Sequence, residues 1–100
     1  MATALVLGEI EDVTLGAASA VEQLTGIAQA KWLILYPPAS GDQLVDVAIV
    51  TRSGGSVAAD GRWVPKETID LGGYPFDISP YGFVGLAGSA AGSVRVEVRS

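Results

Sequence analysis

The feature that most constrains this chain is the regular interruption of its apolar segments. Clusters of Gly, Pro, Ser and Asp cut the sequence at intervals of roughly eight to twelve residues. Short segments at this spacing, several of them rich in Val and Ile, are typical of an all-β sandwich or barrel. We therefore predict one domain, residues 1–100, folded as a small antiparallel β-sandwich. The sandwich is expected to be jelly-roll-like or Ig-like, with about seven or eight strands.

Three segments in the first half carry the clearest strand signals. Ala4–Leu15 is predicted as one strand with a possible bulge at Gly8. Lys31–Pro37 is a continuous apolar run, which predicts a central strand buried on both faces, with Trp32 in the core. Leu44–Arg52 is rich in β-branched residues and is the strongest strand prediction.

The C-terminal segment shows a strict alternation of apolar and charged residues. A small-residue stretch, Gly88–Gly92, precedes it and predicts a hairpin-type turn. Because successive side chains of a strand point to opposite faces, one set should face the core and the other solvent or a neighbouring subunit. The core-facing set is Val94, Val96 and Val98, and the outward set is Arg95, Glu97 and Arg99.

Two other segments are less clear. Val57–Pro65 contains Asp60-Gly61, a favoured hairpin turn, and Lys66–Gly73 is predicted as a strand with alternating faces. Ala17–Leu33 has apolar residues at helical intervals, but Gly26 in its middle costs about 1 kcal/mol relative to Ala. A short helix in Ala17–Leu33 therefore remains an alternative to strands.

Composition and charge exclude several classes of protein. With 49% hydrophobic and 17% charged residues, the chain is not disordered. The low charged fraction indicates either a surface covered by a partner or an apolar count raised by abundant Ala and Gly. The net charge is −5 and the six basic residues are scattered, so we expect no nucleic-acid partner.

The N-terminal segment does not have the pattern of a signal peptide. It lacks a positively charged start, and Glu9, Glu11 and Asp12 interrupt its apolar run. No stretch approaches the ~18 uncharged apolar residues of a membrane helix. We therefore expect synthesis in the cytosol and no membrane partner.

The sequence offers no set of residues for catalysis. Cys and His are both absent, which removes thiolate chemistry, the usual serine-hydrolase base and the commonest zinc ligands. The glycines do not form a phosphate-binding loop, and the carboxylates fall mostly on predicted turns and polar faces. We expect no enzyme activity, cofactor or metal. A calcium ion held by Asp42 with Asp46, or by Asp77, is a minor alternative without EF-hand spacing.

The aromatic residues beside turns are the main candidates for a binding surface. Trp63, Tyr74 and Tyr81 could stack on sugars or anchor a protein interface, or could close the open ends of the sandwich.

The order of several segments resembles a known group of proteins. The matching segments are Ala20–Leu24 (AVEQL), Val47–Thr51 (VAIVT), Glu67–Leu71 (ETIDL), Phe83–Gly88 (FVGLAG) and Val94–Val96 (VRV). Their order is similar to that in the small β-sandwich virion proteins of tailed bacteriophages, the head-decoration (cement) and spike-base subunits.

The resemblance implies a non-enzymatic structural protein of the virion. It implies a capsid decoration protein, assembled in the host cytoplasm, that binds the outer surface of the major capsid shell or another virion component. It also implies a homo-trimer or similar cyclic homo-oligomer, which the low charge and the loop aromatics favour as well. Arg95 and Arg99, predicted to face solvent or a neighbouring subunit, join the three aromatic residues as candidate interface residues. The alternative is a carbohydrate-binding or adhesion-type module that uses the loop aromatics.

Overall fold

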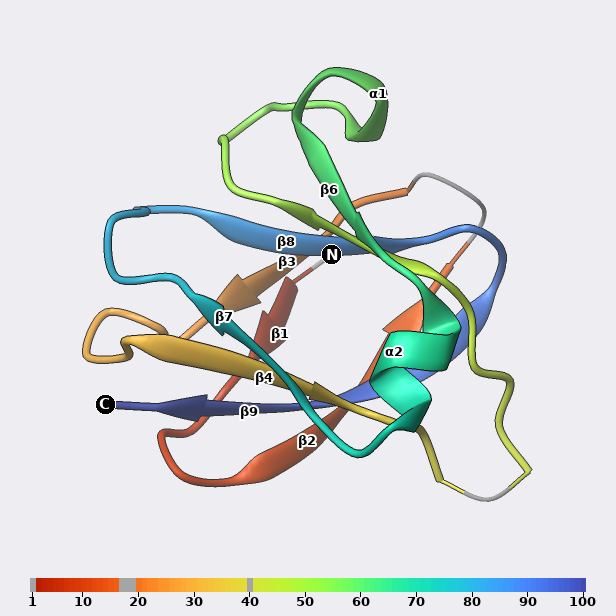
Figure 1. The fold of residues 1–100 in the computed structure, drawn as a ribbon. Coiled ribbons are helices and arrows are strands. Elements are labelled where there is room, and N and C mark those ends of the chain that lie inside the picture. The colour runs from red at the N-terminus through yellow and green to blue at the C-terminus, as the bar shows by residue number, and fades with distance from the viewer. Residues whose placement is uncertain (1, 17–19, 40) are drawn as a thin grey trace.

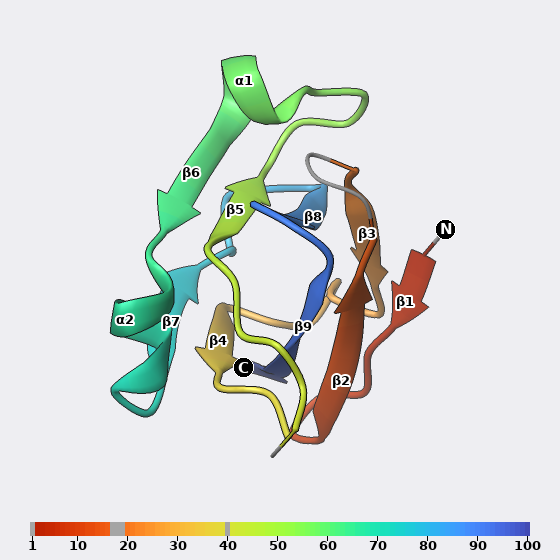
Figure 2. The same cartoon turned by 90° about the vertical axis from the view of Figure 1, so that its right-hand side faces the viewer.

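The computed structural model describes residues 2–16, 20–39 and 41–100, which form two packed sheets and two short helices (Figures 1 and 2). The five-stranded sheet has the order β1 (Ala2–Ala4), β3 (Glu22–Thr25), β8 (Val84–Gly88), β5 (Val47–Val50) and β6 (Gly61–Val64). The four-stranded sheet has the order β2 (Ile10–Leu15), β9 (Gly92–Arg99), β4 (Trp32–Tyr36) and β7 (Tyr74–Asp77). The helices are α1 (Val57–Asp60) and α2 (Lys66–Asp70).

This architecture confirms the predicted all-β sandwich. The described residues form nine strands, against the seven or eight expected. All pairs are antiparallel except β1 with β3, which run parallel. Neither helix in the described part of the chain has the length and apolar character needed to span a bilayer.

The strand order follows from one long hairpin that is rolled up. β5 pairs with β6, β4 with β7, β3 with β8 and β2 with β9, so each pair lies further from the tip, which carries α1 (Figure 1). Rolling then places β8 beside β5 and β9 beside β4. Nested pairing of this kind across two sheets is the jelly roll, so the jelly roll is the one of the two predicted sandwiches that is observed.

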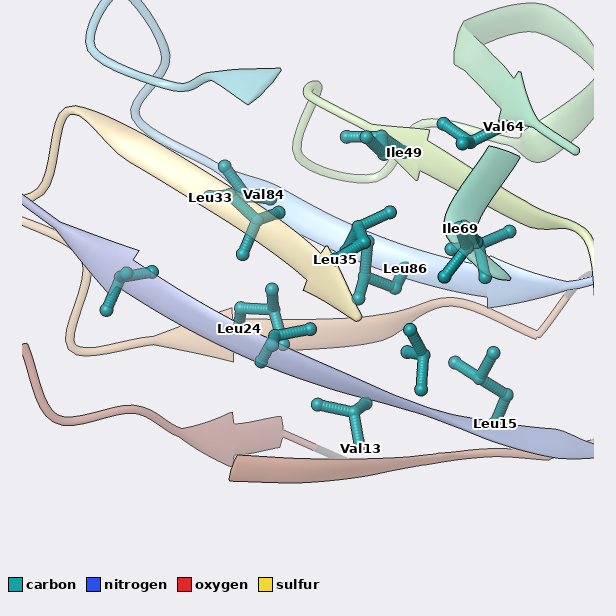
Figure 3. Close-up of a cluster of buried hydrophobic side chains, with 14 of the residues drawn as sticks. Val13, Leu15, Leu24, Leu33, Leu35, Ile49, Val64, Ile69, Val84 and Leu86 are labelled. Carbon is teal, nitrogen blue, oxygen red and sulfur yellow. The ribbon is translucent and has the colours of Figure 1, made fainter. Parts of the chain in front are cut away.

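The main core lies between the two sheets (Figure 3). Its largest fully buried side chains come from both sheets and from α2, and include Leu15, Leu24, Leu33, Leu35, Ile49, Ile69 and Leu86. The predicted alternation along β9 is confirmed for its valines, because Val94, Val96 and Val98 are all fully buried. Glu97 differs from the prediction, since only 7% of it is exposed although it lies on the opposite side of the strand.

A second, smaller apolar cluster covers the other face of the five-stranded sheet. It contains Ala48 and Val50 of β5, Ala87 of β8 and Val57 of α1, with Val21 and Phe83 packed against it. Because this cluster lies opposite the main core, β5 and β8 are buried on both faces.

The prediction that Lys31–Pro37 is buried on both faces, with Trp32 in the core, is wrong. In β4 only Leu33 and Leu35 point into the core, and Trp32 is 36% exposed. An uninterrupted apolar run hides this alternation, because every position looks equally suited to burial.

Helix α1 replaces the hairpin turn predicted at Asp60-Gly61. The Ser56 Oγ accepts a hydrogen bond from the Ala59 N–H (3.1 Å), and the Ser56 N–H donates to the Asp60 carboxylate (3.0 Å). These reciprocal bonds satisfy the free donors of the first turn, as in a capping box. The helix ends at Asp60, and Gly61 begins β6.

Helix α2 replaces the strand predicted at Lys66–Gly73. Pro65 precedes the helix, and the Lys66 N–H donates to the Asp46 carboxylate (2.8 Å). Ile69 is fully buried beneath the helix, and the positive φ angles of Gly72 (108°) and Gly73 (126°) turn the chain into β7. Helix α2 therefore buries one side chain in its single turn, instead of every second side chain as a strand would.

Two predicted local features are instead crossings between the sheets. Gly8 lies in a turn between β1 and β2, which belong to different sheets, so Ala4–Leu15 is not a single bulged strand. The stretch Gly88–Gly92 likewise carries the chain from β8 in one sheet to β9 in the other, and is not a hairpin turn.

The helix considered for Ala17–Leu33 is not formed over its described part. Residues 17–19 lie outside the described residues, and the remainder holds β3 and the start of β4. Gly26 separates the two strands with a φ of 76°, and a Cβ there would overlap the Leu5 carbonyl oxygen.

We predict that Gly85→Ala destabilises the protein by about 1–3 kcal/mol. An added Cβ would lie 2.5 Å from the Val21 Cγ1 and 3.3 Å from the Phe83 ring, so the second cluster must shift. Urea denaturation measures the loss. The matched control is Gly82→Ala, where nothing lies within 4 Å of the added Cβ. Equal stability of the two variants would show that the cluster is not closely packed.

Candidate functional site

The four-stranded sheet presents a broad face that points away from the core. We call this surface the outer face. The pairing registers place residues from all four strands on it, alternating with the buried ones. They are Ile10, Asp12 and Thr14 of β2, Arg95, Glu97 and Arg99 of β9, Trp32, Ile34 and Tyr36 of β4, and Pro75 and Asp77 of β7.

A hydrogen-bonded carboxylate lies at the centre of the outer face. The Tyr36 hydroxyl donates to one oxygen of Glu97 (2.8 Å), and the Arg99 Nε donates to the other (3.0 Å). The Glu97 side chain is only 8% exposed, whereas that of Arg99 is 59% exposed. Both oxygens of the buried carboxylate are therefore satisfied, which is the condition for burying a charge on a sheet surface.

This arrangement changes the pKa of each of the three groups. The hydrogen bond from Arg99, followed by that from Tyr36, lowers the pKa of Glu97. The bond to Glu97 is also the largest cause that raises the pKa values of Tyr36 and Arg99. Glu97 is thus ionised at neutral pH and serves to hold Tyr36 and Arg99 in place. A general acid or base would need a pKa near the working pH. The shifts instead move the pKa values of Glu97, Tyr36 and Arg99 further from neutrality.

Exposed apolar side chains lie on the two strands that flank the carboxylate and in the adjoining turn. Six large apolar side chains are exposed in the described chain; two of them, Ile10 and Trp32, lie on the outer face, and Val6 and Leu7 lie in the turn before β2. Ile10 pairs with Glu97 and Trp32 with Arg99, so they flank β9 on either side. The turn with Val6 and Leu7 is held beside β9 by a hydrogen bond from the Gly8 N–H to the Val98 carbonyl (2.8 Å).

Charged groups also lie on or beside the outer face. The Arg95 Nε donates to the Asp12 carboxylate (3.1 Å) across β2 and β9, and both side chains are exposed. The Lys31 ammonium lies 5.7 Å from the centre of the Trp32 ring. Of the candidate interface residues from the sequence, Arg95 and Arg99 are thus brought onto one surface.

The three candidate aromatic residues are not brought together. Trp63 lies on β6 and points away from the core on the other sheet, since it pairs with Ala48 of the second cluster. Tyr74 is half-buried and packs against the main core. Tyr81 lies in the β7–β8 loop, parallel to Phe76 with the ring centres 6.2 Å apart. They do not form a common flat platform.

A hollow of about 430 Å³ lies at one end of the sandwich. We call it the end pocket. It lies between the β3–β4 turn and the β7–β8 loop, and its lining includes Gln23, Thr25, Ile27, Ser79 and Tyr81. Tyr81 is therefore the one of the three candidate aromatics that lines a concave site.

The carboxylates considered for calcium are engaged in local hydrogen bonds. Asp46 accepts from the Lys66 N–H (2.8 Å), and Asp77 accepts from the N–H (2.9 Å) and hydroxyl (2.6 Å) of Ser79. The Ser79 hydrogen bonds are also the main cause that lowers the pKa of Asp77. Among the residues that the structure describes, no three His, Cys, Asp or Glu side chains gather into a group that could hold a metal ion.

Sequence reasoning missed Trp32 and the partners of Glu97. Trp32 was hidden within an apolar run. The bond between Tyr36 and Glu97 joins residues 61 positions apart, which no local pattern reveals. The available signal was the period of two in Lys31–Pro37, where the aromatic side chains Trp32 and Tyr36 fall on the same face.

Comparisons of the chain with protein-family models, with curated proteins and with solved structures found no match. A function for this chain consequently depends on its own geometry.

We predict that Glu97→Gln lowers stability at neutral pH and that the loss disappears in acid. A carboxylate whose folded pKa is lowered stabilises the fold above its unfolded pKa, about 4.3 for Glu. That stabilisation is lost as the pH falls through the folded pKa. Urea denaturation of wild type and variant should therefore differ at about pH 7, begin to converge below about pH 4 and coincide once the pH is below the folded pKa of Glu97.

Two further variants test the cause. Tyr36→Phe removes one of the two hydrogen bonds and should give a smaller loss than Glu97→Gln. Glu67→Gln, on the exposed side of α2, is the matched control for removing a carboxylate and should have less effect at neutral pH. A difference between wild type and Glu97→Gln that persists unchanged into acid would contradict the assigned role.

Proposed function

We propose that this chain is a non-enzymatic structural protein of a bacteriophage virion. In this proposal it is a capsid decoration protein that binds the outer surface of the major capsid shell through its outer face and stabilises the shell. The observation that carries the proposal is the cluster of Trp32, Tyr36 and Arg99 around the buried carboxylate of Glu97.

The composition of this cluster suits a protein interface. Trp, Tyr and Arg are the residue types that dominate binding energy at interfaces, where they lie within a patch that excludes water. Here Tyr36 and Arg99 are fixed by Glu97 before any partner binds. Prior ordering lowers the entropy cost of association, because fewer side-chain rotations are lost on binding.

The surroundings of the cluster support the same role. Ile10 and Trp32 provide exposed apolar area on either side of β9, and Val6 and Leu7 extend it at the adjoining turn. Asp12, Arg95 and Asp77 lie around it as polar groups. Exposed apolar area beside an ion-paired carboxylate, with further polar groups around it, gives this surface the mixed composition of a docking surface.

The fold and the sequence resemblance point to a virus particle as the partner. Jelly rolls build viral capsid and lectin domains, although a shared fold alone does not establish a function. Three of the segments that resemble phage virion proteins correspond to β5, β8 and β9. A cyclic homo-oligomer, such as a trimer, completes the proposal, since low charge suits a subunit that is partly covered by neighbours.

The first test is the protein content of purified phage particles. Quantitative mass spectrometry should find this chain at hundreds of copies per particle if it decorates the capsid. A handful of copies would instead indicate a spike, connector or tail component. Absence from the particles would refute the virion role altogether.

The second test compares the two tryptophans. We predict that Trp32→Ala weakens binding to capsids that lack the protein by at least about 30-fold, the effect of losing about 2 kcal/mol at an interface anchor. Trp63→Ala is the matched control, because Trp63 is exposed on the opposite sheet, and should bind as wild type does. Weakened binding by Trp63→Ala, with Trp32→Ala binding as wild type does, would instead assign the docking surface to the five-stranded sheet.

A further inference from the structure

The end pocket is a consequence of how the long hairpin is rolled. β3 and β8 pair in the five-stranded sheet, and β4 and β7 pair in the four-stranded sheet. Both arms of the hairpin therefore cross between the sheets at the same end, side by side. A hydrogen bond from the Ile78 N–H to the Lys31 carbonyl (2.8 Å) ties the two crossings together.

The hollow is left open because the crossings are built from small residues. Gly26, Ala28, Ala30 and Gly82 all line it. Gly26 is required at its position, since its φ is positive and a Cβ would overlap the Leu5 carbonyl oxygen. Residues this small cannot fill the space between two crossing segments, so the gap persists where larger side chains would close it.

The lining is polar but uncharged. Gln23, Thr25, Ser79 and Tyr81 contribute amide and hydroxyl groups, while Leu24, Ile27 and Ile78 contribute apolar area. Among the described residues none of the lining side chains is ionisable at neutral pH. The Thr25 and Ser79 hydroxyls already donate hydrogen bonds, to the Thr3 carbonyl (3.4 Å) and to Asp77 (2.6 Å), so they can act toward a ligand as acceptors. The Gln23 amide and the Tyr81 hydroxyl can donate as well as accept.

The aromatic ring in the pocket is held in a fixed orientation. Tyr81 lies parallel to Phe76, and the Arg62 guanidinium lies 5.8 Å from the centre of the Phe76 ring. Tyr81 thus packs against a neighbouring ring, which reduces the ordering cost when a ligand contacts it.

We propose that the end pocket binds a neutral sugar residue. A pyranose ring has one apolar face of C–H groups, which suits an aromatic ring, and a rim of hydroxyls, which suits amide and hydroxyl partners. The volume of about 430 Å³ lies within the range of roughly 300–1,000 Å³ found for small-ligand sites. None of the lining residues belongs to the outer face, although the lining residue Ser79 is hydrogen-bonded to Asp77 at the edge of that face.

The proposal is tested by titrating the full-length chain with D-glucose, D-galactose and N-acetyl-D-glucosamine and following its ¹H–¹⁵N spectrum. We expect at least one sugar to give saturable shifts, with a Kd in the millimolar range, at the amides of Gly26, Ala28, Ser79 and Gly82. Saturable shifts confined elsewhere, or none with any of the three sugars, would overturn the proposal.

Matched variants then assign the contacts. Gln23→Ala, in β3, should weaken binding about threefold to tenfold, the value of one hydrogen bond, whereas Gln29→Ala, in the β3–β4 turn but outside the lining, should not change it. Tyr81→Ala should weaken it by about tenfold or more, and Tyr81→Phe should retain most of the stacking.

The controls separate this site from the alternatives. Trp63→Ala should leave sugar binding unchanged. Loss of sugar binding in that variant would overturn the end pocket and would indicate a site at β6, the edge strand of the five-stranded sheet. If Tyr81→Ala proves unfolded by its spectrum, the Gln23 and Gln29 pair decides the question. Equal affinity of those two variants would then refute the site.

Discussion

Strand β9 lies between β2 and β4, and its two edges hold the four-stranded sheet together. Its inward side supplies three fully buried valines to the core, and its outward side supplies Glu97 and Arg99 to the outer face. The same backbone pairing therefore sets both the packing of the sandwich and the geometry of the proposed docking surface. A change of register by one residue would exchange the two sides and destroy both.

The two candidate sites depend on the rolled hairpin in different ways. The outer face is built on paired strands, whose register fixes the spacing of Tyr36, Glu97 and Arg99. The end pocket is built where paired strands stop and both arms cross between the sheets. Side chains on strands suit a broad rigid contact, whereas small residues at a crossing leave room for a small ligand. One topology thus provides a flat surface and a concave one.

Sequence patterns predicted the parts of the structure that depend on local preference. The spacing of turns indicated the all-β sandwich, and the alternation in β9 indicated its buried valines. The patterns failed where a distant partner decides the outcome. Lys66–Asp70 is a helix because Asp46 accepts a hydrogen bond from the Lys66 N–H and because Ile69 is buried in the core. Glu97 is buried because the Tyr36 hydroxyl reaches it from another strand. Arg95, Arg99 and Tyr81 were candidates from the sequence, which did not predict that the two arginines share the outer face and that Tyr81 lines the end pocket.

The rolled hairpin also determines the order in which the chain can fold. Contacts at its tip are local, such as those between Ser56 and Asp60, whereas Asp12 and Arg95 meet across 83 positions of sequence. The cost of closing a loop grows with its length, so pairing is expected to advance from α1 outwards and to finish when β9 docks. Topologies dominated by such distant pairs fold in milliseconds to seconds. Until that last step, the edges of β2 and β4 that pair with β9 are open, so the insertion of β9 removes two edges at which another chain could pair.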